Sequence, residues 1–165
     1  MRRALLILAL LLPLGAYGQM AGGIMESQRQ GNIRGTTTNN NATAGSVGEY
    51  VEALPGAVST NTAADVNYGS VSLTAGDWDA TCQISTTNGS TNTGLKVGLS
   101  TTSATFGATV GVNWVFAACN ATAGVCAATH SQRLSLSATT TVYCVQRTFV
   151  ANSLTNGVIS ARRVR

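Results

Sequence analysis

The sequence predicts an all-β protein, folded as an antiparallel β-sandwich or barrel. Three observations predict this class. Short runs of alternating apolar and polar residues follow one another at intervals of roughly eight to fifteen residues. Thr, Val and Ala are abundant, whereas only 10% of the 165 residues are charged, and this composition favours pleated sheet over surface helix. Eighteen glycines supply turns, and no amphipathic helix of ordinary length appears after residue 18.

Each expected strand is an alternating run bounded by turn residues. The first run is ambiguous, because so short a window also fits a helical turn. The stretch SLTAGDWDATC places a Gly-Asp corner between the second and third runs, and we expect Trp78 to point inward there and Asp77 and Asp79 to face water. The expected strands cover 47–54, 64–74, 77–86, 94–101, 109–118, 131–137, 139–150 and 156–164.

The alternation also predicts which side chains face the interior. In the third run these are Trp78, Ala80, Cys82 and Ile84. The run 139–150 is apolar on both sides, although Arg147 interrupts the second side. Its two sides are Val142, Cys144, Thr148 and Val150 on one, and Tyr143, Val145 and Phe149 on the other. A strand that is apolar on both faces is normally buried on both, so we expect a covering layer. That layer comes from another subunit or from a thick core of the same chain.

Residues 1–18 have the layout of a secretory signal peptide. Two arginines precede an apolar run, Pro13 ends it, and small residues precede a cleavage site before Gln19. The run is too short to span a bilayer comfortably. We therefore expect export, to the periplasm, the cell surface or the medium. An uncleaved anchor, which would bring a membrane partner, is the alternative.

Cleavage would lower the net charge from +4 to +2, because eight basic and six acidic residues remain. The basic balance therefore gives no support for nucleic-acid binding. Residues 19–33 show no clear period, and 34–46 are rich in Thr, Asn and Gly. We expect 19–46 to form a flexible arm or linker and 47–165 to form the β-sandwich domain.

The four cysteines agree with an oxidising compartment. Four cysteines allow three pairings. Six residues including a glycine separate Cys119 from Cys126, which suits a bond across the neck of a hairpin loop. Cys82 and Cys144 each lie in an alternating run and could face one another across the core, so we favour Cys119–Cys126 with Cys82–Cys144. A zinc site is the rival interpretation, but no CxxC is present and His130 is the only histidine, so we expect neither metal nor cofactor.

The acidic residues give little support for catalysis. Asp77 and Asp79 form one close pair, and Glu49 and Glu52 form the other. Catalytic carboxylates need a cleft and a differently placed partner, whereas an aspartate after glycine caps its own turn. His130 has no acidic neighbour in the chain, and no serine has a GxSxG context. We therefore expect a protein that is not an enzyme.

Asn113, Trp114 and Phe116 are the candidate contact residues. They lie beside the expected disulfide loop, where aromatic side chains on a rigid element can form a platform for a sugar or a protein. Packing of both aromatic residues in the core is the alternative.

The arginines near the C-terminus follow a different pattern. Arg162, Arg163 and Arg165 lie along and just after the last expected strand. We expect them on a solvated face, or across a subunit boundary from Glu49 or Glu52. Binding of an acidic partner is a further alternative.

Five stretches, in order along the chain, resemble a widespread group of small structural proteins of tailed bacteriophages and prophages. They are GTTTNNNATAGSVGEYVEA, SVSLTAGDWDATC, GLSTTSATF, RLSLSATTTVYCV and the ending ISARRVR, and together they span about residues 34–165. The resemblance implies a virion structural module, of the kind found in tail fibres, spikes and head decorations. It also implies a β-sandwich, of jelly-roll type, that assembles as a homotrimer and presents a receptor-contacting tip. No catalytic residue comes with the resemblance.

Two features depart from that group. Phage proteins usually fold in the cytoplasm and need neither a signal peptide nor disulfides, and Cys82 and Cys144 occupy positions where small or apolar residues are expected. The function that we expect is that of a non-enzymatic, virion-associated attachment protein that contacts a glycan or protein receptor on a host surface. The alternative is a secreted, prophage-derived bacterial adhesin or carbohydrate-binding module.

Overall fold

Nine β-strands and their connections make up the described part of the chain. The computed structural model describes residues 41–60, 64–88, 92–121, 125–149 and 153–164, and none of these is helical. The all-β prediction is therefore confirmed, and the segment 47–54 contains a strand, not a helical turn. The strands are β1 (Tyr50–Ala53), β2 (Val58–Thr60), β3 (Val66–Leu73), β4 (Gly76–Asn88), β5 (Asn92–Ser100), β6 (Trp114–Ala121), β7 (Val125–Leu136), β8 (Thr140–Thr148) and β9 (Ser153–Arg163).

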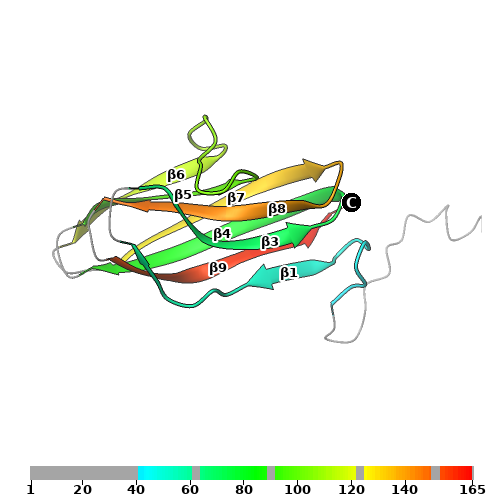
Figure 1. Cartoon of the computed structure of the whole chain (residues 1–165), viewed down its shortest axis with the longest axis horizontal. Coiled ribbons are helices and arrows are strands. Elements are labelled where there is room, and N and C mark those ends of the chain that lie inside the picture. The colour runs from blue at the N-terminus through cyan, green and yellow to red at the C-terminus, as the bar shows by residue number, and fades with distance from the viewer. Residues whose placement is uncertain (1–40, 61–63, 89–91, 122–124, 150–152, 165) are drawn as a thin grey trace, which may run out of the picture. The chain divides into compact units, whose positions relative to one another are not determined.

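The strands form two antiparallel sheets. Sheet A has the order β1-β9-β4-β7, with β2 also pairing with β9, and sheet B has the order β3-β8-β5-β6. Strands of both sheets run lengthwise in Figure 1, and the connection between β5 and β6 rises above them at the top. The arrangement is compatible with a β-sandwich.

The core lies between the two sheets. The inward side chains that the alternation predicts for β4 are all fully buried, and the first and largest of them is Trp78. Burial of each large apolar side chain in this layer contributes about 1.5–3 kcal/mol to stability. The side chains of sheet B that face β4 belong mainly to β5 and β8, and they include Leu95, Val97, Leu99, Val142 and Cys144.

Both disulfides join sheet A to sheet B. Cys82 on β4 is bonded to Cys144 on β8, with their Cα atoms 5.6 Å apart, through the middle of the core. Cys119 on β6 is bonded to Cys126 on β7, with a Cα separation of 5.7 Å. This is the pairing that the sequence favours. The expected hairpin is wrong, however, because β6 and β7 lie at the edges of different sheets. Two disulfides indicate an oxidising, exported environment.

The strand boundaries differ most from prediction around the connection between β5 and β6. The strand expected over 109–118 begins only at Trp114, because 101–113 form a loop that turns at Gly111 with a φ of 79°. β7 begins at Val125, six residues before the strand expected over 131–137. It is longer than expected because it pairs with the long strand β4 from Gly76 to Thr87. β2 was not expected as a separate strand.

The second apolar side of β8 is covered in part by the same chain. Val145 is fully buried on this side, and it pairs with Asn67 of β3. The loop 101–113 reaches across to that position, where the backbone N–H of Ala104 donates a hydrogen bond of 2.7 Å to Asn67 Oδ1. Val145 therefore needs no second subunit to bury it. Phe149, on the same side, remains 42% exposed.

Several expectations concern residues outside the described ranges. The expected signal peptide, 1–18, and all of the expected arm before residue 41 fall there, as do Val150 and Arg165. The compact unit that contains both sheets runs from Thr38 to Arg165. Among the described residues, no helix has the length and apolar character needed to cross a membrane.

Candidate functional site: the aromatic face of sheet B

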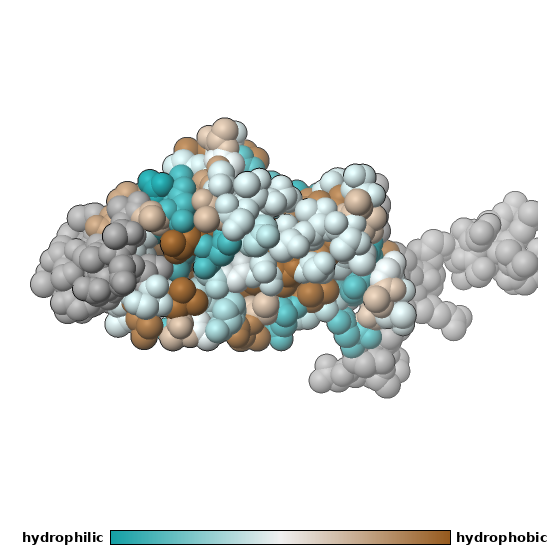
Figure 2. All heavy atoms as spheres, in the orientation of Figure 1, coloured by the Kyte–Doolittle hydropathy of each residue, from teal (hydrophilic) through white to brown (hydrophobic). Residues whose placement is uncertain are grey.

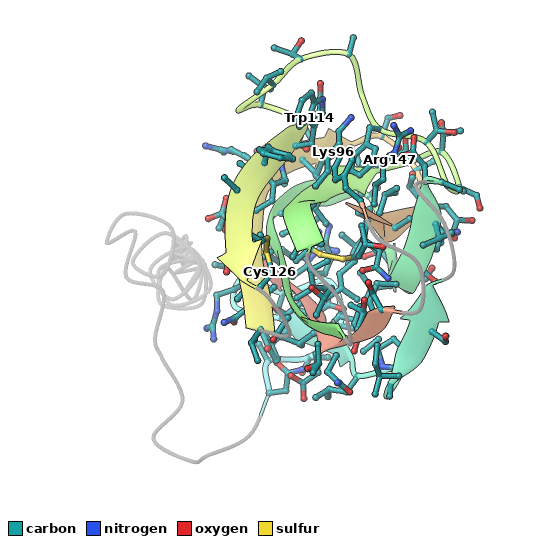
Figure 3. The ribbon with its side chains drawn as sticks, turned by 90° about the vertical axis from the view of Figure 1, so that its left-hand side faces the viewer. Lys96, Trp114, Cys126 and Arg147 are labelled. Atoms are coloured by element: carbon teal, nitrogen blue, oxygen red, sulfur yellow. A yellow bond between two sulfur atoms is a disulfide. The ribbon has the colours of Figure 1, made fainter. Side chains whose placement is uncertain are left out.

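The candidate contact residues from β6 lie on the outer face of sheet B. Strand register places Lys96 of β5 between Phe116 of β6 and Arg147 of β8, and it places Trp114 opposite Gly98. Residues on either side of these along each strand point into the core, so this set points outward. Figure 3 shows Trp114, Lys96 and Arg147 in a row along one side of the molecule. We call the following set the aromatic face: Lys96, Phe106, Trp114, Phe116, Arg147 and Phe149.

Lys96 lies against two aromatic rings. Its Nζ atom is 3.7 Å from the centroid of Trp114 and 4.0 Å from that of Phe106. A cation over an aromatic ring gains about 0.5–1 kcal/mol at an exposed site. Burial lowers the pKa of Lys96 below the ordinary lysine value, against the raising effect of Asp65 and together with the repulsion from Arg147. Arg147 itself donates a 2.6 Å hydrogen bond from Nε to Asp65 Oδ1.

Phe116 and Phe149 form an exposed aromatic pair beside this cation. Their ring centroids are 5.6 Å apart in an edge-to-face arrangement, and the two residues are 49% and 42% exposed. The ring of Phe116 lies over Gly94 of β5, where any Cβ atom would collide with it. Because Gly94 has no side chain, the ring of Phe116 can pack directly against the backbone of β5. Phe116 is not a core residue, whereas Trp114 is partly buried.

Asn113 fixes the end of the loop 101–113. Its backbone N–H donates to the Thr109 carbonyl at 2.9 Å, and its Oδ1 atom accepts the Thr109 N–H at 3.2 Å. Its carbonyl oxygen accepts the Leu99 N–H at 3.2 Å. Side-chain hydrogen bonds of this kind stabilise a turn locally. The structure therefore gives Asn113 a role in loop geometry, and its side chain is half-buried.

A cleft of about 250 Å³ lies beside the aromatic face. β6 begins opposite Gly98, so Leu99 and Ser100 of β5 extend beyond it, and the edge of sheet B opens toward β7. The loop 101–113 forms one wall and β7 forms the other. The lining residues are Leu99, Ser100, Thr101, Thr102, Thr105, Phe106, Gly107, Asn113, Gln132 and Leu134, none of which is charged.

Two buried polar atoms lie on β7 at and beside this cleft. His130 is 2% exposed, and its Nε2 atom has no hydrogen-bond partner among the described residues. Oε1 of Gln132 is also buried, and the Gln132 side chain interacts with the neighbouring His130 ring on the same face of β7. Burial lowers the pKa of His130 below its ordinary value, although the Val112 backbone and the Gln132 side chain, both close to the ring, oppose this shift. His130 thus stays neutral where an exposed histidine would begin to take up a proton.

A second cluster, the corner cluster, lies at the Gly-Asp corner between β3 and β4. It consists of Glu49, Thr74, Ala75, Trp78 and Arg163. The guanidinium of Arg163 donates to Glu49 at 3.0 Å, to the Ala75 carbonyl at 2.7 Å and to the Thr74 hydroxyl. It also lies 4.4 Å from the centroid of Trp78. The prediction of a solvated face or a subunit boundary is wrong for Arg163, which is 4% exposed and pairs with Glu49 of its own chain.

The corner has the predicted form in part. Trp78 points into the core and Asp79 is exposed, as predicted, whereas Asp77 is only partly exposed and forms a 3.2 Å ion pair with Arg133. Gly76 opens β4 with a φ of 139°, a conformation that other residues rarely adopt. Arg162 is exposed and lies 5.6 Å from the ring centroid of Tyr50. Three of the stretches that carry the phage resemblance, those with GEY, LTAGDWD and ARRVR, meet at this corner.

Sequence reasoning missed four parts of the aromatic face, namely Lys96, Phe106, Arg147 and Phe149. Lys96 is the only lysine in the chain and interrupts the apolar run 94–99, which is the signal that could have identified it. In the part of the chain that the structure describes, no cluster of three or more His, Cys, Asp or Glu side chains could hold a metal ion. No family model, no curated protein and no solved structure matches the chain.

Proposed function

We propose that this protein is a non-enzymatic structural and attachment module of the kind carried by tailed-phage particles. Its β-sandwich is of jelly-roll type, assembles as a homotrimer, and contacts a receptor on a host surface through the aromatic face. One observation carries the proposal: an exposed aromatic pair, Phe116 and Phe149, lies beside a cation on a face that two disulfide-linked sheets hold in place. Aromatic and arginine side chains are enriched at the centres of recognition surfaces.

The order of strand pairing supports the jelly-roll part of the proposal. β1 and β2 pair with β9, β3 pairs with β8, β4 with β7, and β5 with β6. These nested pairs describe one long antiparallel ribbon, folded over on itself, whose closed end is the loop 101–113. If β1 and β2 count as two segments of one edge strand, eight strands lie in two sheets of four. Jelly rolls of eight strands are common in viral capsid and lectin domains.

The distribution of hydropathy over the surface, and the positions of the acidic residues, support an attachment function over an enzymatic one. Figure 2 shows strongly hydrophilic and strongly hydrophobic residues in small separate patches on the visible face, between larger areas of near-neutral hydropathy. Against such a surface, an aromatic pair with a neighbouring cation is a distinctive contact point. The acidic pairs that catalysis would need lie elsewhere, with Glu49 in the corner cluster and Asp77 paired with Arg133.

The trimer is supported by the resemblance and by the number of exposed apolar side chains. These are Val47, Tyr50, Leu54, Val110, Val112, Phe116, Val125, Phe149 and Leu154. Light scattering of the natively produced protein at micromolar concentration should give the mass of three chains. A monomer mass would contradict the trimer and leave the attachment surface to be tested separately.

Attachment is tested by the double variant Phe116→Ala/Phe149→Ala. Binding of labelled protein to bacteria of the strain that carries the gene, and of related strains, should fall by about tenfold or more, because truncation of central aromatic residues has effects of that size. Leu154→Ala is the matched control, since Leu154 is 45% exposed but lies on the outer face of sheet A. Equal binding by the double variant and the unmodified protein would reject the aromatic face as the contact surface.

A secreted adhesin or carbohydrate-binding module on the same fold is the second candidate. The two disulfides favour it, because virion proteins that fold in the cytoplasm have no use for them. N-terminal sequencing and mass measurement of the native protein, from purified particles and from the culture medium, separate the two candidates. Protein found in particles supports the virion role, and protein confined to the medium or the cell surface supports the adhesin.

A further inference from the structure

We propose that the aromatic face binds a sugar residue that carries a carboxylate group. The inference rests on the proposed attachment function and names the ligand class that this face would recognise. Strand register places Lys96 of β5 directly opposite Arg147 of β8, and Figure 3 shows the two cations side by side. Like charges directly opposite one another on a sheet are destabilising, so a negatively charged ligand would be favoured beside them.

The charged groups of this face leave one positive charge in surplus. Lys96 and Arg147 are two cations, whereas Asp65 is the single acidic group that the described structure brings to them. Asp65 is bonded to Arg147, and no described carboxylate forms an ion pair with Lys96. One carboxylate on a ligand would balance the surplus. A phosphate monoester, with a charge of about −1.5 to −2 at pH 7, would bring further charge that must lose water beside aromatic rings without a cationic partner.

Two aromatic rings hold the ammonium of Lys96 in place. Its Nζ atom is 3.7 Å from the ring centroid of Trp114 and 4.0 Å from that of Phe106. Aromatic rings attract a cation without cancelling its net charge. Lys96 is also partly exposed, so its charge is open to a ligand. A lysine that is already ordered loses less side-chain entropy on binding than one that moves freely in solvent.

The exposed pair of Phe116 and Phe149 supplies the surface for the sugar ring. Phe116 lies opposite Lys96 in the strand register, on the side away from Arg147. Neighbouring strands are about 4.8 Å apart, so a single sugar residue can rest on the pair and reach the ammonium with its carboxylate. The C–H groups of the sugar ring would pack against the negative faces of the aromatic rings.

The surplus charge sets the specificity of this face. The aromatic pair alone would accept neutral and acidic sugars alike, because both present C–H groups to it. The cation adds an attraction that only the acidic sugar receives, and a hydrogen bond to a charged group contributes more than a neutral one. The aromatic face should therefore prefer a uronic acid to the neutral hexose of the same stereochemistry.

The test is an NMR titration of the ¹⁵N-labelled protein, with both disulfides intact, using methyl glycosides that differ only at C6. The acidic probes are the methyl glycosides of glucuronic acid and galacturonic acid. Their matched probes are methyl glucoside and methyl galactoside, which are neutral, and the 6-phosphates of these two.

At least one uronic acid probe should shift the indole N–H of Trp114 and the amide of Phe116 saturably at millimolar concentration. Its neutral and phosphorylated counterparts should bind at least fivefold more weakly. The indole N–H of Trp78, which is buried and donates to the Thr74 carbonyl at 2.9 Å, is the internal reference and should not move.

Three variants separate the charge from the fold. Lys96→Met should reduce the affinity for the uronic acid to that of its neutral counterpart, a fall of about fivefold or more. Lys96→Arg keeps the charge and should keep most of the affinity. Arg162→Met is the matched control and should leave the affinity unchanged, because it removes an exposed cation beside Tyr50 on the outer face of sheet A. An unchanged Trp78 indole resonance shows that each variant is folded.

Four results would overturn the inference. They are the absence of shifts at Trp114 and Phe116 with both uronic acids, equal affinities for acidic and neutral probes, tighter binding of a phosphorylated probe, and unchanged affinity in Lys96→Met. If the protein binds host cells through the aromatic face while no uronic acid binds there, this inference fails and the attachment function stands. If a uronic acid binds to the face while the protein does not bind cells, the attachment function fails alone.

Discussion

Each of the two tryptophans in this protein lies against a cation, and the two arrangements differ in almost every other respect. At the corner cluster, Arg163 lies 4.4 Å from the Trp78 centroid, and both residues are buried. On the aromatic face, Lys96 lies 3.7 Å from the Trp114 centroid, and both residues are partly exposed. Arg163 has a carboxylate, a carbonyl and a hydroxyl around it. Among the described residues, Lys96 has no carboxylate within ion-pair distance.

The difference separates a contact that holds the fold from one that is open to a partner. A buried charge must have its hydrogen bonds satisfied inside the protein, and a planar guanidinium does so with several acceptors at once. An ammonium on a flexible stem is suited to the edge of a surface, where solvent or a ligand completes its shell. A cation packed on a tryptophan ring therefore has two roles in this protein. At the corner cluster the contact stabilises the fold, and on the aromatic face it holds a positive charge where a partner can reach it.

The largest effect is expected from Arg163→Met. The substitution leaves the Glu49 carboxylate buried without its cation, and removal of one partner from a buried pair costs about 3–5 kcal/mol. Urea unfolding followed by tryptophan fluorescence, with both disulfides intact, measures the free energy of unfolding. Glu49→Gln combined with Arg163→Met should cost less than the sum of the single changes, because the neutral amide needs no counter-charge.

If Arg163→Met lowers the free energy of unfolding by less than about 1 kcal/mol, the contrast between the corner cluster and the aromatic face is wrong. That value is typical of an exposed ion pair and would mean that the corner cluster is no more structural than the aromatic face. An unchanged m-value in the unfolding curves would show that the variant still reaches the same folded state.

A smaller effect is expected from pH, through His130. Its pKa is lowered by burial from the ordinary 6.5, so the unfolded chain binds a proton at a pH where the folded chain does not. The unfolded state therefore binds more protons between the folded pKa and 6.5. Stability should be full above this window, decline as the pH falls through it, and level off below the folded pKa.

Urea midpoints measured near pH 7.5 and near pH 5.5 test this, since about pH 6.5 is where a free histidine titrates. His130 is the only histidine in the chain, so His130→Gln should remove the decline between these two conditions. A decline that persists in the variant would assign the pH dependence to other groups.

The sequence predicted the parts of the fold that depend on local alternation. Trp78 and Ile84 are buried as the period of two requires, and Asp79 at the Gly-Asp corner is exposed as predicted, although Asp77 is not. Features that depend on long-range contacts were not predictable in the same way. Arg163 is buried because Glu49, 114 residues away in sequence, meets it. Residues 109–113 alternate like a strand but form a loop, because β6 pairs with β5 only from Trp114 onward.

The site shows the same division. Trp114 and Phe116 were identified because aromatic residues beside a disulfide are conspicuous in the sequence. Phe106 and Phe149 were missed as part of the site because only the strand order of sheet B and the path of the loop bring them to the same face. The cleft could not be predicted, since it exists where β5 extends beyond the first residue of β6.

The smallest effect on stability is expected from Lys96→Met, and it gives the sharpest form of the comparison. Methionine keeps a flexible apolar stem against Phe106 and Trp114 and removes the charge, so the free energy of unfolding should change by less than about 1 kcal/mol. Binding to host cells should nevertheless weaken, and it should become less sensitive to salt, because an exposed cation contributes through screened electrostatic attraction. Salt titrations of cell binding, run beside urea unfolding of the same preparation, measure both quantities. If Lys96→Met lowers the free energy of unfolding as much as Arg163→Met does, Lys96 is a structural residue. In that case the cation–tryptophan contacts at both sites stabilise the fold, and the contrast between them is wrong.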